Sequence, residues 1–371
     1  MKHRIGKLTL TVLALLLSTS LAGAASLTQL QGKVHYLDQG DENLEQKMQR
    51  AARDFADTNR EGCYFTGHIF TAGHGLHMGE RLDPEVPYSV SVSAQEIRLR
   101  RTLRRSSENE TISDREPPEP GPAGLLLLHC LSKGQNRILD AKPFDPEKSY
   151  RFSDTPIYWL GKADTDQSFA LLTDRFPQGS AGLQNSLVFV ISLHNSPQVG
   201  AFLQDAALGD SPLKVRKSAI FWLGNLKTPE SFRSLKRILS RVKDRELKKQ
   251  VVFAFSLSDE KQAVEEIIQI ARQDPDQEVR KQAVFWLGQK ASREALKALE
   301  EVVAGKDEDT EVKKSAVFAI SQLPNEQSVP ILISIAKSHP NAAVRKNAIF
   351  WLGQSGEEEA IKFFEDILLK K

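Results

Sequence analysis

The chain has 371 residues, and its 50 lysines and arginines against 48 acids give a net charge of +2. This near balance provides no overall attraction to nucleic acid, so we expect no nucleic-acid partner. A chain of this length exceeds one ordinary hydrophobic core. Two domains, or one domain followed by an elongated array, are therefore expected.

Residues 1–24 have the pattern of a cleaved signal peptide. Three bases precede an apolar run that ends at Leu21, and Ala22-Gly23-Ala24 is a small-residue cleavage motif. No later segment approaches the ~20 apolar residues that a spanning helix needs. Removing three of the 50 bases leaves 47 against 48 acids, a net charge of −1. We expect an exported protein, periplasmic or extracellular, without a membrane span.

Residues 25–152 predict a small α+β domain. An amphipathic pattern favours a helix over 42–58, and a Ser-, Glu- and Pro-rich stretch over 106–123 favours a flexible loop. A helix followed by several strands is typical of an antiparallel sheet with helices on one side. The strand-like segments are 63–70, 88–92, 124–131 and 136–139.

Cys63 and Cys130 are the only cysteines, and both lie in this part of the chain. An even cysteine count in an exported protein predicts a disulfide. The alternative is a transition-metal site built with nearby histidines, although the spacing matches no standard zinc pattern. The side chains of that alternative are Cys63, His68, His74, His77, His129 and Cys130.

Five arginines between residues 98 and 105 form a second basic feature. They predict either the solvated face of a strand or an anion-binding patch.

A four-residue motif recurs through the C-terminal part. It begins with an aromatic residue, which is followed either by Trp-Leu-Gly or by two apolar residues and Ser. Its leading aromatics are spaced 31, 32, 32, 32, 33 and 32 residues apart. A fixed period of this size is the signature of a solenoid. The leading residues are Tyr158, Phe189, Phe221, Phe253, Phe285, Phe318 and Phe350.

The residues around each motif predict a helical hairpin. The stretch 276–288 reads as a turn with an Asp N-cap, then a helix containing the motif, which we call helix B. A second amphipathic segment, such as 263–271, precedes each turn and is called helix A. Residues 153–371 are therefore predicted to form an all-α solenoid of about seven repeats, and 357–371 a last helix A that caps it.

These motifs resemble the HEAT-repeat family, in particular its short-repeat, phycobilin-lyase-like branch, and exported bacterial HEAT-repeat proteins. The resemblance implies an armadillo-like superhelix and a ladder of Asp and basic side chains between neighbouring repeats, here Asp244, Asp276 and Asp309 with Lys248, Arg280 and Lys313. Deoxyhypusine hydroxylase, another HEAT protein, binds iron through His-Glu pairs. None of the eight histidines here is followed by Glu, so the sequence does not have this iron-binding pattern.

Trp-Leu-Gly alternates with smaller motifs from one repeat to the next, and all four tryptophans occupy one column. Stacked helices lie ~8–10 Å apart, too close for a continuous Trp column. We expect large residues beside small ones to let the layers interdigitate, and Gly or Ser to keep the helices close. The structural unit is then a pair of repeats.

The candidate binding site is a column of phenylalanines with a column of lysines beside it. The columns predict either packing between successive B helices or a concave apolar groove with a basic edge for a protein partner. Their members are Phe189, Phe221, Phe253, Phe285, Phe318, Phe350, Lys217, Lys249, Lys281, Lys314 and Lys346.

The favoured function is a non-catalytic protein-binding scaffold of the cell envelope, with no cofactor. Two alternatives stay open. One is an enzymatic or metal-binding activity in the N-terminal domain, and the other is tetrapyrrole handling, which the phycobilin-lyase resemblance implies.

The disulfide prediction has a direct test. Unreduced peptide mapping by mass spectrometry of the exported protein should show Cys63 linked to Cys130. Two free thiols, with zinc found by elemental analysis, would favour the metal site instead.

Overall fold

The structure is a computed structural model that describes residues 30–73, 120–146, 150–151, 155–290, 292–306 and 309–369. The chain divides into two compact units, Met1–Ser196 and Pro197–Lys371. Four sequence predictions lie wholly or partly outside the described residues: the signal peptide, strand 88–92, the arginine cluster and residues 106–119 of the loop.

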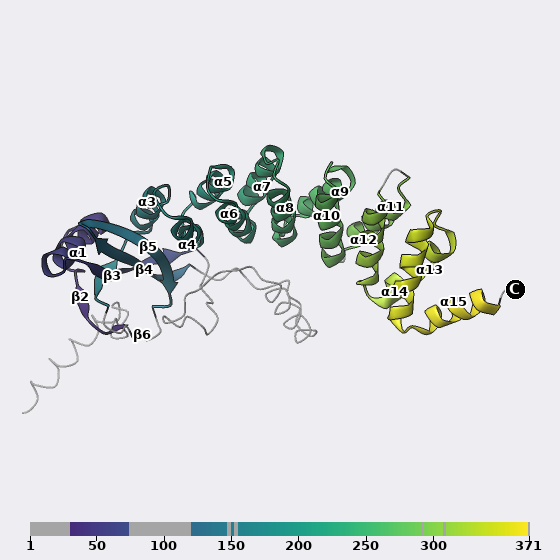
Figure 1. The fold of residues 1–371 in the computed structure, drawn as a ribbon, viewed down its shortest axis with the longest axis horizontal. Coiled ribbons are helices and arrows are strands. Elements are labelled where there is room, and N and C mark those ends of the chain that lie inside the picture. The colour runs from purple at the N-terminus through teal and green to yellow at the C-terminus, as the bar shows by residue number, and fades with distance from the viewer. Residues whose placement is uncertain are drawn as a thin grey trace, which may run out of the picture. The chain divides into compact units, whose positions relative to one another are not determined.

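The first unit is built around a β-sheet (Figure 1). Its strands are β1 (Leu30–Gln31), β2 (Val34–Tyr36), β3 (Gly62–Ala72), β4 (Gly121–Ser132), β5 (Gln135–Phe144), β6 (Tyr150–Arg151) and β7 (Ile157–Lys162). Five of them form one sheet in the order β2-β7-β3-β4-β5, and β1 pairs with β6. β4 begins at Gly121, so the last residues of the predicted loop belong to a strand.

The sheet is mixed, which corrects the prediction of an antiparallel one. β3, β4 and β5 are antiparallel neighbours, whereas β2, β7 and β3 run parallel. Parallel neighbours need a long crossover connection, and here the chain passes through β3, β4 and β5 before β7 returns between β2 and β3. The sequence prediction missed β7, so it contained no parallel partner for β3.

The first of the seven predicted motifs is this missing strand. Tyr158-Trp159-Leu160-Gly161 lies in β7, not in a helix B, so the assignment of residues 157–162 to the solenoid was wrong. Trp159 is fully buried in a cluster with Ile69 and Phe144. A short, continuously apolar run fits a buried strand as well as a buried helix, and periodicity alone does not distinguish them.

Helices cover one face of the sheet. They are α1 (Leu44–Thr58), close to the predicted 42–58, α3 (Thr165–Arg175) and α4 (Ala181–Ser192). Asn43 starts α1 with a capping box. The Phe55 ring lies 4.5 Å from that of Tyr64 in β3, and α4 contacts β5. The helical hairpin α3–α4 is therefore part of the first unit.

A disulfide joins the two central antiparallel strands. Cys63 in β3 and Cys130 in β4 are directly opposite each other, with their Cα atoms 4.1 Å apart. The bond closes a loop with a sequence separation of 67 residues. A cross-link of this kind stabilises a small domain by about 2–5 kcal/mol.

The second unit is a row of antiparallel helix pairs (Figure 1). The A helices are α5 (Val199–Leu208), α7 (Pro229–Arg241), α9 (Lys261–Gln273), α11 (Arg293–Ala304), α13 (Asn325–Ser338) and α15 (Glu358–Leu369). The B helices are α6 (Leu213–Asn225), α8 (Arg245–Leu257), α10 (Gln277–Lys290), α12 (Thr310–Ser321) and α14 (Ala342–Ser355). No helix within the described ranges is long and apolar enough to cross a membrane.

The predicted N-caps of the B helices are confirmed. Asp244, Asp309 and Asn341 each accept a hydrogen bond from a backbone N–H in the first turn of the helix they begin. A side chain that satisfies one of these otherwise unpaired donors is worth about 1 kcal/mol. The caps therefore fix where α8, α12 and α14 begin, whereas α6 follows Pro212 without a side-chain cap.

The ladder implied by the HEAT resemblance is present in part, with contacts between neighbouring repeats that differ from one pair of repeats to the next. The Arg245 guanidinium donates to Asp276 of the next repeat at 2.6 Å, and the Asn341 amide donates to Thr310 at 2.8 Å. The first residue of one helix B thus contacts the N-cap of the next. Of the predicted basic members, Lys248 pairs with Asp274 of the next repeat at 2.8 Å. Arg280 donates to the backbone carbonyl of Asp274 in its own repeat and also interacts electrostatically with Asp309 of the next one.

Close packing between B helices depends on two glycines. A Cβ atom at Gly224 would lie 2.8 Å from Cβ of Ala254, and one at Gly288 would lie 2.9 Å from Cβ of Ala319. Real Cβ atoms do not approach this closely. The prediction that Gly in the Trp-Leu-Gly motif keeps neighbouring helices close is confirmed for the α6–α8 and α10–α12 contacts.

These glycines generate a matched pair of variants. Gly288→Ala should destabilise the chain by about 1–3 kcal/mol because α10 and α12 must separate. Gly353→Ala, at the equivalent position of α14, meets no atom within 4 Å and should stabilise by up to about 1 kcal/mol, since Ala favours a helix. Thermal melts followed by circular dichroism should show shifts of opposite sign, and equal shifts would contradict the packing.

Candidate functional site

Six aromatic rings form a row along the B helices of the second unit. We define the aromatic row as Phe253, Phe285, Phe318, Phe350 and the indoles of Trp286 and Trp351. Phe253 of α8 stacks on Trp286 of α10 with 4.7 Å between ring centroids. Phe318 of α12 lies 5.0 Å from Trp351 of α14. The aromatic side chain of a small-motif repeat thus packs on the tryptophan of the next repeat.

The row remains partly open to solvent. Phe253, Phe285 and Phe318 are half-buried, and Phe350 is 55% exposed. Phe221, earlier in the column, is buried and lies 6.0 Å from Phe253. The same rings therefore pack between helices and contribute to the surface, so the predicted packing role is present and the groove for a partner stays a prediction. The remaining member, Phe189, is half-buried on α4 of the first unit.

The tryptophans differ from the sequence prediction, which placed them in the core of the solenoid. Trp222, Trp286 and Trp351 are all half-buried. The indole N–H groups of Trp286 and Trp351 are covered, yet neither has a hydrogen-bond acceptor among the described residues. Each indole is therefore partly packed within the array and partly exposed to solvent.

The lysine column lies beside acids of the same helices. Lys249, Lys281 and Lys314 each pair with the glutamate three residues earlier, at 3.1, 3.0 and 3.0 Å. Lys217 lies 3.7 Å from Glu246 of the next helix B. Lys346 is exposed and has no ion-pair partner among the described residues. The predicted basic edge is therefore neutralised along most of its length, and among the described residues Lys346 is the one member of the column without an ion pair.

The first unit contains a buried chain of polar side chains that sequence reasoning did not find. Ser168 Oγ lies 2.9 Å from Nε2 of His68 and 2.9 Å from Nε2 of His194. His194 Nδ1 must donate to the carbonyl of Val190, 3.0 Å away, because a carbonyl only accepts. Ser168 then donates to His194 and accepts from His68.

Burial keeps these histidines neutral. Burial, with a smaller effect of His194, lowers the pKa of His68 to about 3, and burial lowers the pKa of His194 to about 4. Burial likewise lowers the pKa of His129, which contacts Thr66 at 2.9 Å, to about 4. The network fixes α3 and the end of α4 against the sheet, and its covered groups are not accessible to a substrate.

The side chains of the alternative metal site are dispersed. Cys63 and Cys130 are bonded to each other, His68 and His129 make the separate contacts given above, and His74 and His77 lie outside the described residues. No group of three or more potential ligands comes together within the described ranges.

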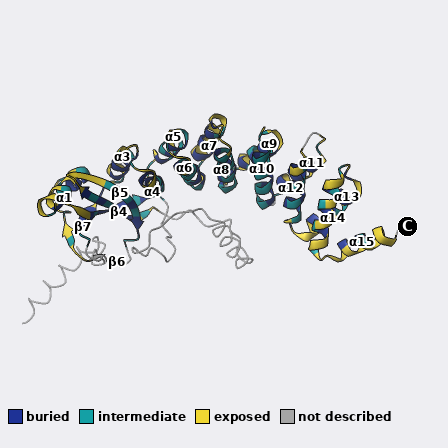
Figure 2. Cartoon of the chain, viewed as in Figure 1, coloured by how far each residue is buried: buried dark blue, intermediate teal, exposed yellow. Residues whose placement is uncertain are grey.

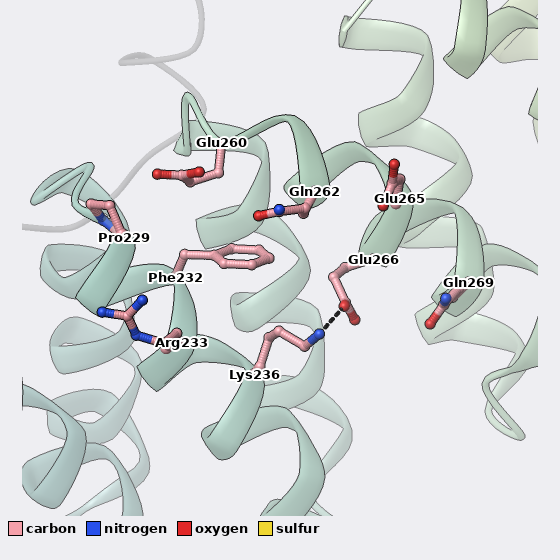
Figure 3. Close-up of a pocket in the computed structure, with 9 residues that line it drawn as sticks. All are labelled: Pro229, Phe232, Arg233, Lys236, Glu260, Gln262, Glu265, Glu266 and Gln269. Carbon is pink, nitrogen blue, oxygen red and sulfur yellow. Dashed lines mark ion pairs between the residues drawn. The ribbon is translucent and has the colours of Figure 1, made fainter.

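A groove of about 500 Å³ separates the A helices α7 and α9 (Figure 3). Its lining is largely polar and charged, and the Lys236 ammonium pairs with Glu266 across it at 2.5 Å. Lys236 also lies 5.8 Å from the ring centre of Phe232. Ligand pockets usually combine an apolar lining with a few polar groups, so the aromatic row is the better candidate for binding.

Paired helices repeated about every 32 residues, with a packed row of B helices, define an α-solenoid. Residues 264–332 and 303–371 match the family model of HEAT repeats. Residues 264–371 thus contain HEAT repeats, as the motifs of this part predicted. No curated protein is significantly similar to it.

Solved structures are similar to part of the chain, and two of them are described here. Human deoxyhypusine hydroxylase in complex with glycerol is 20% identical, over 55% of this chain and 79% of that one, with a TM-score of 0.25. The complex of CpcE and CpcF of phycocyanin lyase from a species of Nostoc is 21% identical, over 47% and 72%, with a TM-score of 0.32.

The buried histidines predict a loss of stability in acid. Their pKa values are lowered on folding, so between about pH 6.5 and 4 the unfolded chain binds more protons and stability falls as the pH falls. His68→Gln should reduce this loss by about 1.4 kcal/mol per pH unit. Urea unfolding at several pH values measures the slope. His35→Gln, at an exposed position, is the control, and equal slopes in the two variants would contradict the assignment.

Proposed function

We propose that this chain is a non-catalytic scaffold of the cell envelope that binds a protein partner along the aromatic row of its second unit. The HEAT array provides a long surface built from repeated elements, on which a partner can contact several helices at once. The proposal places recognition on the B helices, not in the polar groove between α7 and α9.

The observation that carries this proposal is the partial exposure of aromatic rings that are already ordered by contacts with one another, stacked for Phe253 on Trp286 and edge-to-face within α10 and α14. Phe285 and Trp286 lie 5.0 Å apart, as do Phe350 and Trp351. Aromatic side chains fixed in this way lose little conformational entropy on binding and offer a large apolar area. A row of them, open on one side, is suited to an extended or helical apolar segment.

The charges beside the row indicate the chemistry of that segment. Paired lysines and glutamates present both signs of charge in alternation, so the edge has little net attraction for an acidic partner. We infer a partner whose apolar residues contact the rings and whose flanking residues carry both charges. Binding of this kind depends weakly on salt, because it is driven mainly by apolar contact.

The location and the absence of catalysis are part of the proposal. The signal-like residues 1–24 and the disulfide of Cys63 with Cys130 support an oxidising compartment outside the cytoplasm. Within the described ranges, His68, Ser168 and His194 have the side chains of a catalytic group, but they are buried and hydrogen-bonded to one another. Those contacts support a structural role for it.

Photo-crosslinking in the native cell tests the proposal. A benzophenone amino acid placed at Phe285 or Phe318 should yield a discrete protein adduct, because both side chains are half-buried members of the row. The same group at Gln269, exposed on the A helix α9, is the matched control. Adducts from Gln269 with none from the row would assign binding to the opposite side and contradict the proposal.

A further inference from the structure

The A helices of the second unit contact each other in alternation. Helix α5 packs against α7 and α9 packs against α11, whereas no comparable contact joins α7 to α9 or α11 to α13 among the described residues. The groove of about 500 Å³ lies at the first of these two gaps. We call α5 to α8 and α9 to α12 repeat pairs, and the contact of α8 with α10 is the junction between them.

The motifs of the B helices explain why the A helices separate at the junction. Within a repeat pair, a Cβ atom at Gly224 of α6 would lie 2.8 Å from that of Ala254 in α8, so the two helices are almost in backbone contact. At the junction, by contrast, Phe253 of α8 stacks on Trp286 of α10. The spacing of two packed helices depends on the side chains between them, and rings hold them further apart than glycine does.

The turns between helix A and helix B stay joined across the junction. The Arg245 guanidinium donates to Asp276 at 2.6 Å, and the Lys248 ammonium pairs with Asp274 at 2.8 Å. Both contacts connect the first turns of α8 with the turn between α9 and α10. Together with the ring stack they keep α8 and α10 in contact, so a relative movement of the two repeat pairs turns about the B helices.

The walls of the groove resist such a movement only weakly. Apart from Phe232, the lining residues are exposed or half-buried, as the colours of α7 and α9 in Figure 2 indicate. Lys236 and Glu266 form an ion pair across the groove, and the Lys236 side chain is half exposed, so water and salt weaken their attraction. Because the lining is mostly polar, a change in its width exposes or buries little apolar surface.

We propose that the second unit bends at the α8–α10 junction, and that the groove between α7 and α9 opens and closes as it bends. The Phe253–Trp286 stack and the turn contacts are the hinge, and the repeat pairs on either side move as rigid bodies. The ion pair of Lys236 with Glu266 is a latch that favours the closed form.

The hinge has a consequence for the aromatic row, because Phe253 and Trp286 belong to both. Bending changes the angle between the rings on α8 and those on α10. A partner that contacts rings on both helices binds best at one angle and therefore selects it. This consequence rests on the proposed function, whereas the hinge itself requires no partner.

Distances between spin labels on the A helices of the full-length chain test the hinge. Arg237→Cys is combined with either Asp205→Cys or Gln269→Cys, at exposed positions 32 residues before and after it. The native cysteines are joined in the disulfide and take no label. Electron paramagnetic resonance should give a distance distribution at least about twofold wider for the labels on α7 and α9, across the groove, than for those on α5 and α7.

Removing the latch should shift the distribution across the groove. Glu266→Gln should move it toward longer distances, and so should raised salt in the labelled chain that keeps Glu266, since salt screens an exposed ion pair. Glu301→Gln is the matched control. It removes the ion pair of Glu301 with Arg272, which lies within a repeat pair, and should leave the α7–α9 distances unchanged.

Truncating the ring at the hinge should have the opposite effect. Trp286→Leu should shorten the mean α7–α9 distance, because a smaller side chain lets α8 and α10 approach. Trp351→Leu makes the same change in α14, where Trp351 contacts Phe318 of α12, and should leave that distance as it is.

Equal widths for the two label pairs would overturn the proposal. Two narrow distributions would mean that the junction is rigid, and two wide ones would mean that the repeat pairs are not rigid bodies. An unchanged distribution in Glu266→Gln would contradict the latch. None of these measurements involves a partner, so failure of the hinge and failure of binding along the aromatic row are distinguishable.

Discussion

The close approach of neighbouring B helices is the constraint on which the second unit depends. At Gly224 and Gly288 the backbone of one helix lies almost against an alanine of the next, which a side chain would prevent. The intervening contacts use rings instead, with Phe253 on Trp286. Two kinds of contact therefore alternate, and the structural unit is a pair of repeats. The same alternation leaves rings partly exposed along the B helices, so the packing of the array generates its candidate binding surface.

Much of this arrangement could be predicted from the sequence, because the period of about 32 residues recurs from Phe189 to Phe350 and an Asp or Asn cap precedes the last four B helices. One motif is an exception. Tyr158-Trp159-Leu160-Gly161 has the right letters at the right spacing, yet it is a buried strand of the first unit. No Asp N-cap and no pair of bases precede it, in contrast to the motifs at Phe253, Phe285 and Phe318. The local signals that start a helix therefore distinguish this strand from the motifs of the array, whereas spacing alone does not.

The residues of the candidate site could be predicted from the sequence, but the ion pairs that neutralise its lysines were not part of that prediction. The phenylalanine and lysine columns follow from period and helical geometry. The acids that neutralise Lys249, Lys281 and Lys314 lie three residues earlier on the same helices, a spacing visible in the sequence that the initial interpretation did not use. The contacts of His68, Ser168 and His194 could not be derived in this way, because they join segments 26 and 100 residues apart.

Hydroxyl-radical footprinting of the native chain, read residue by residue in a mass spectrometer, tests most directly whether the B helices pack tightly while presenting an accessible row of rings. The account predicts strong oxidation of Phe350, intermediate oxidation of Phe253, Phe285 and Phe318, and protection of Phe255, which is fully buried in the same array. If Phe253, Phe285 and Phe318 are as protected as Phe255, the rings serve only to pack the helices together and the aromatic row is not a surface.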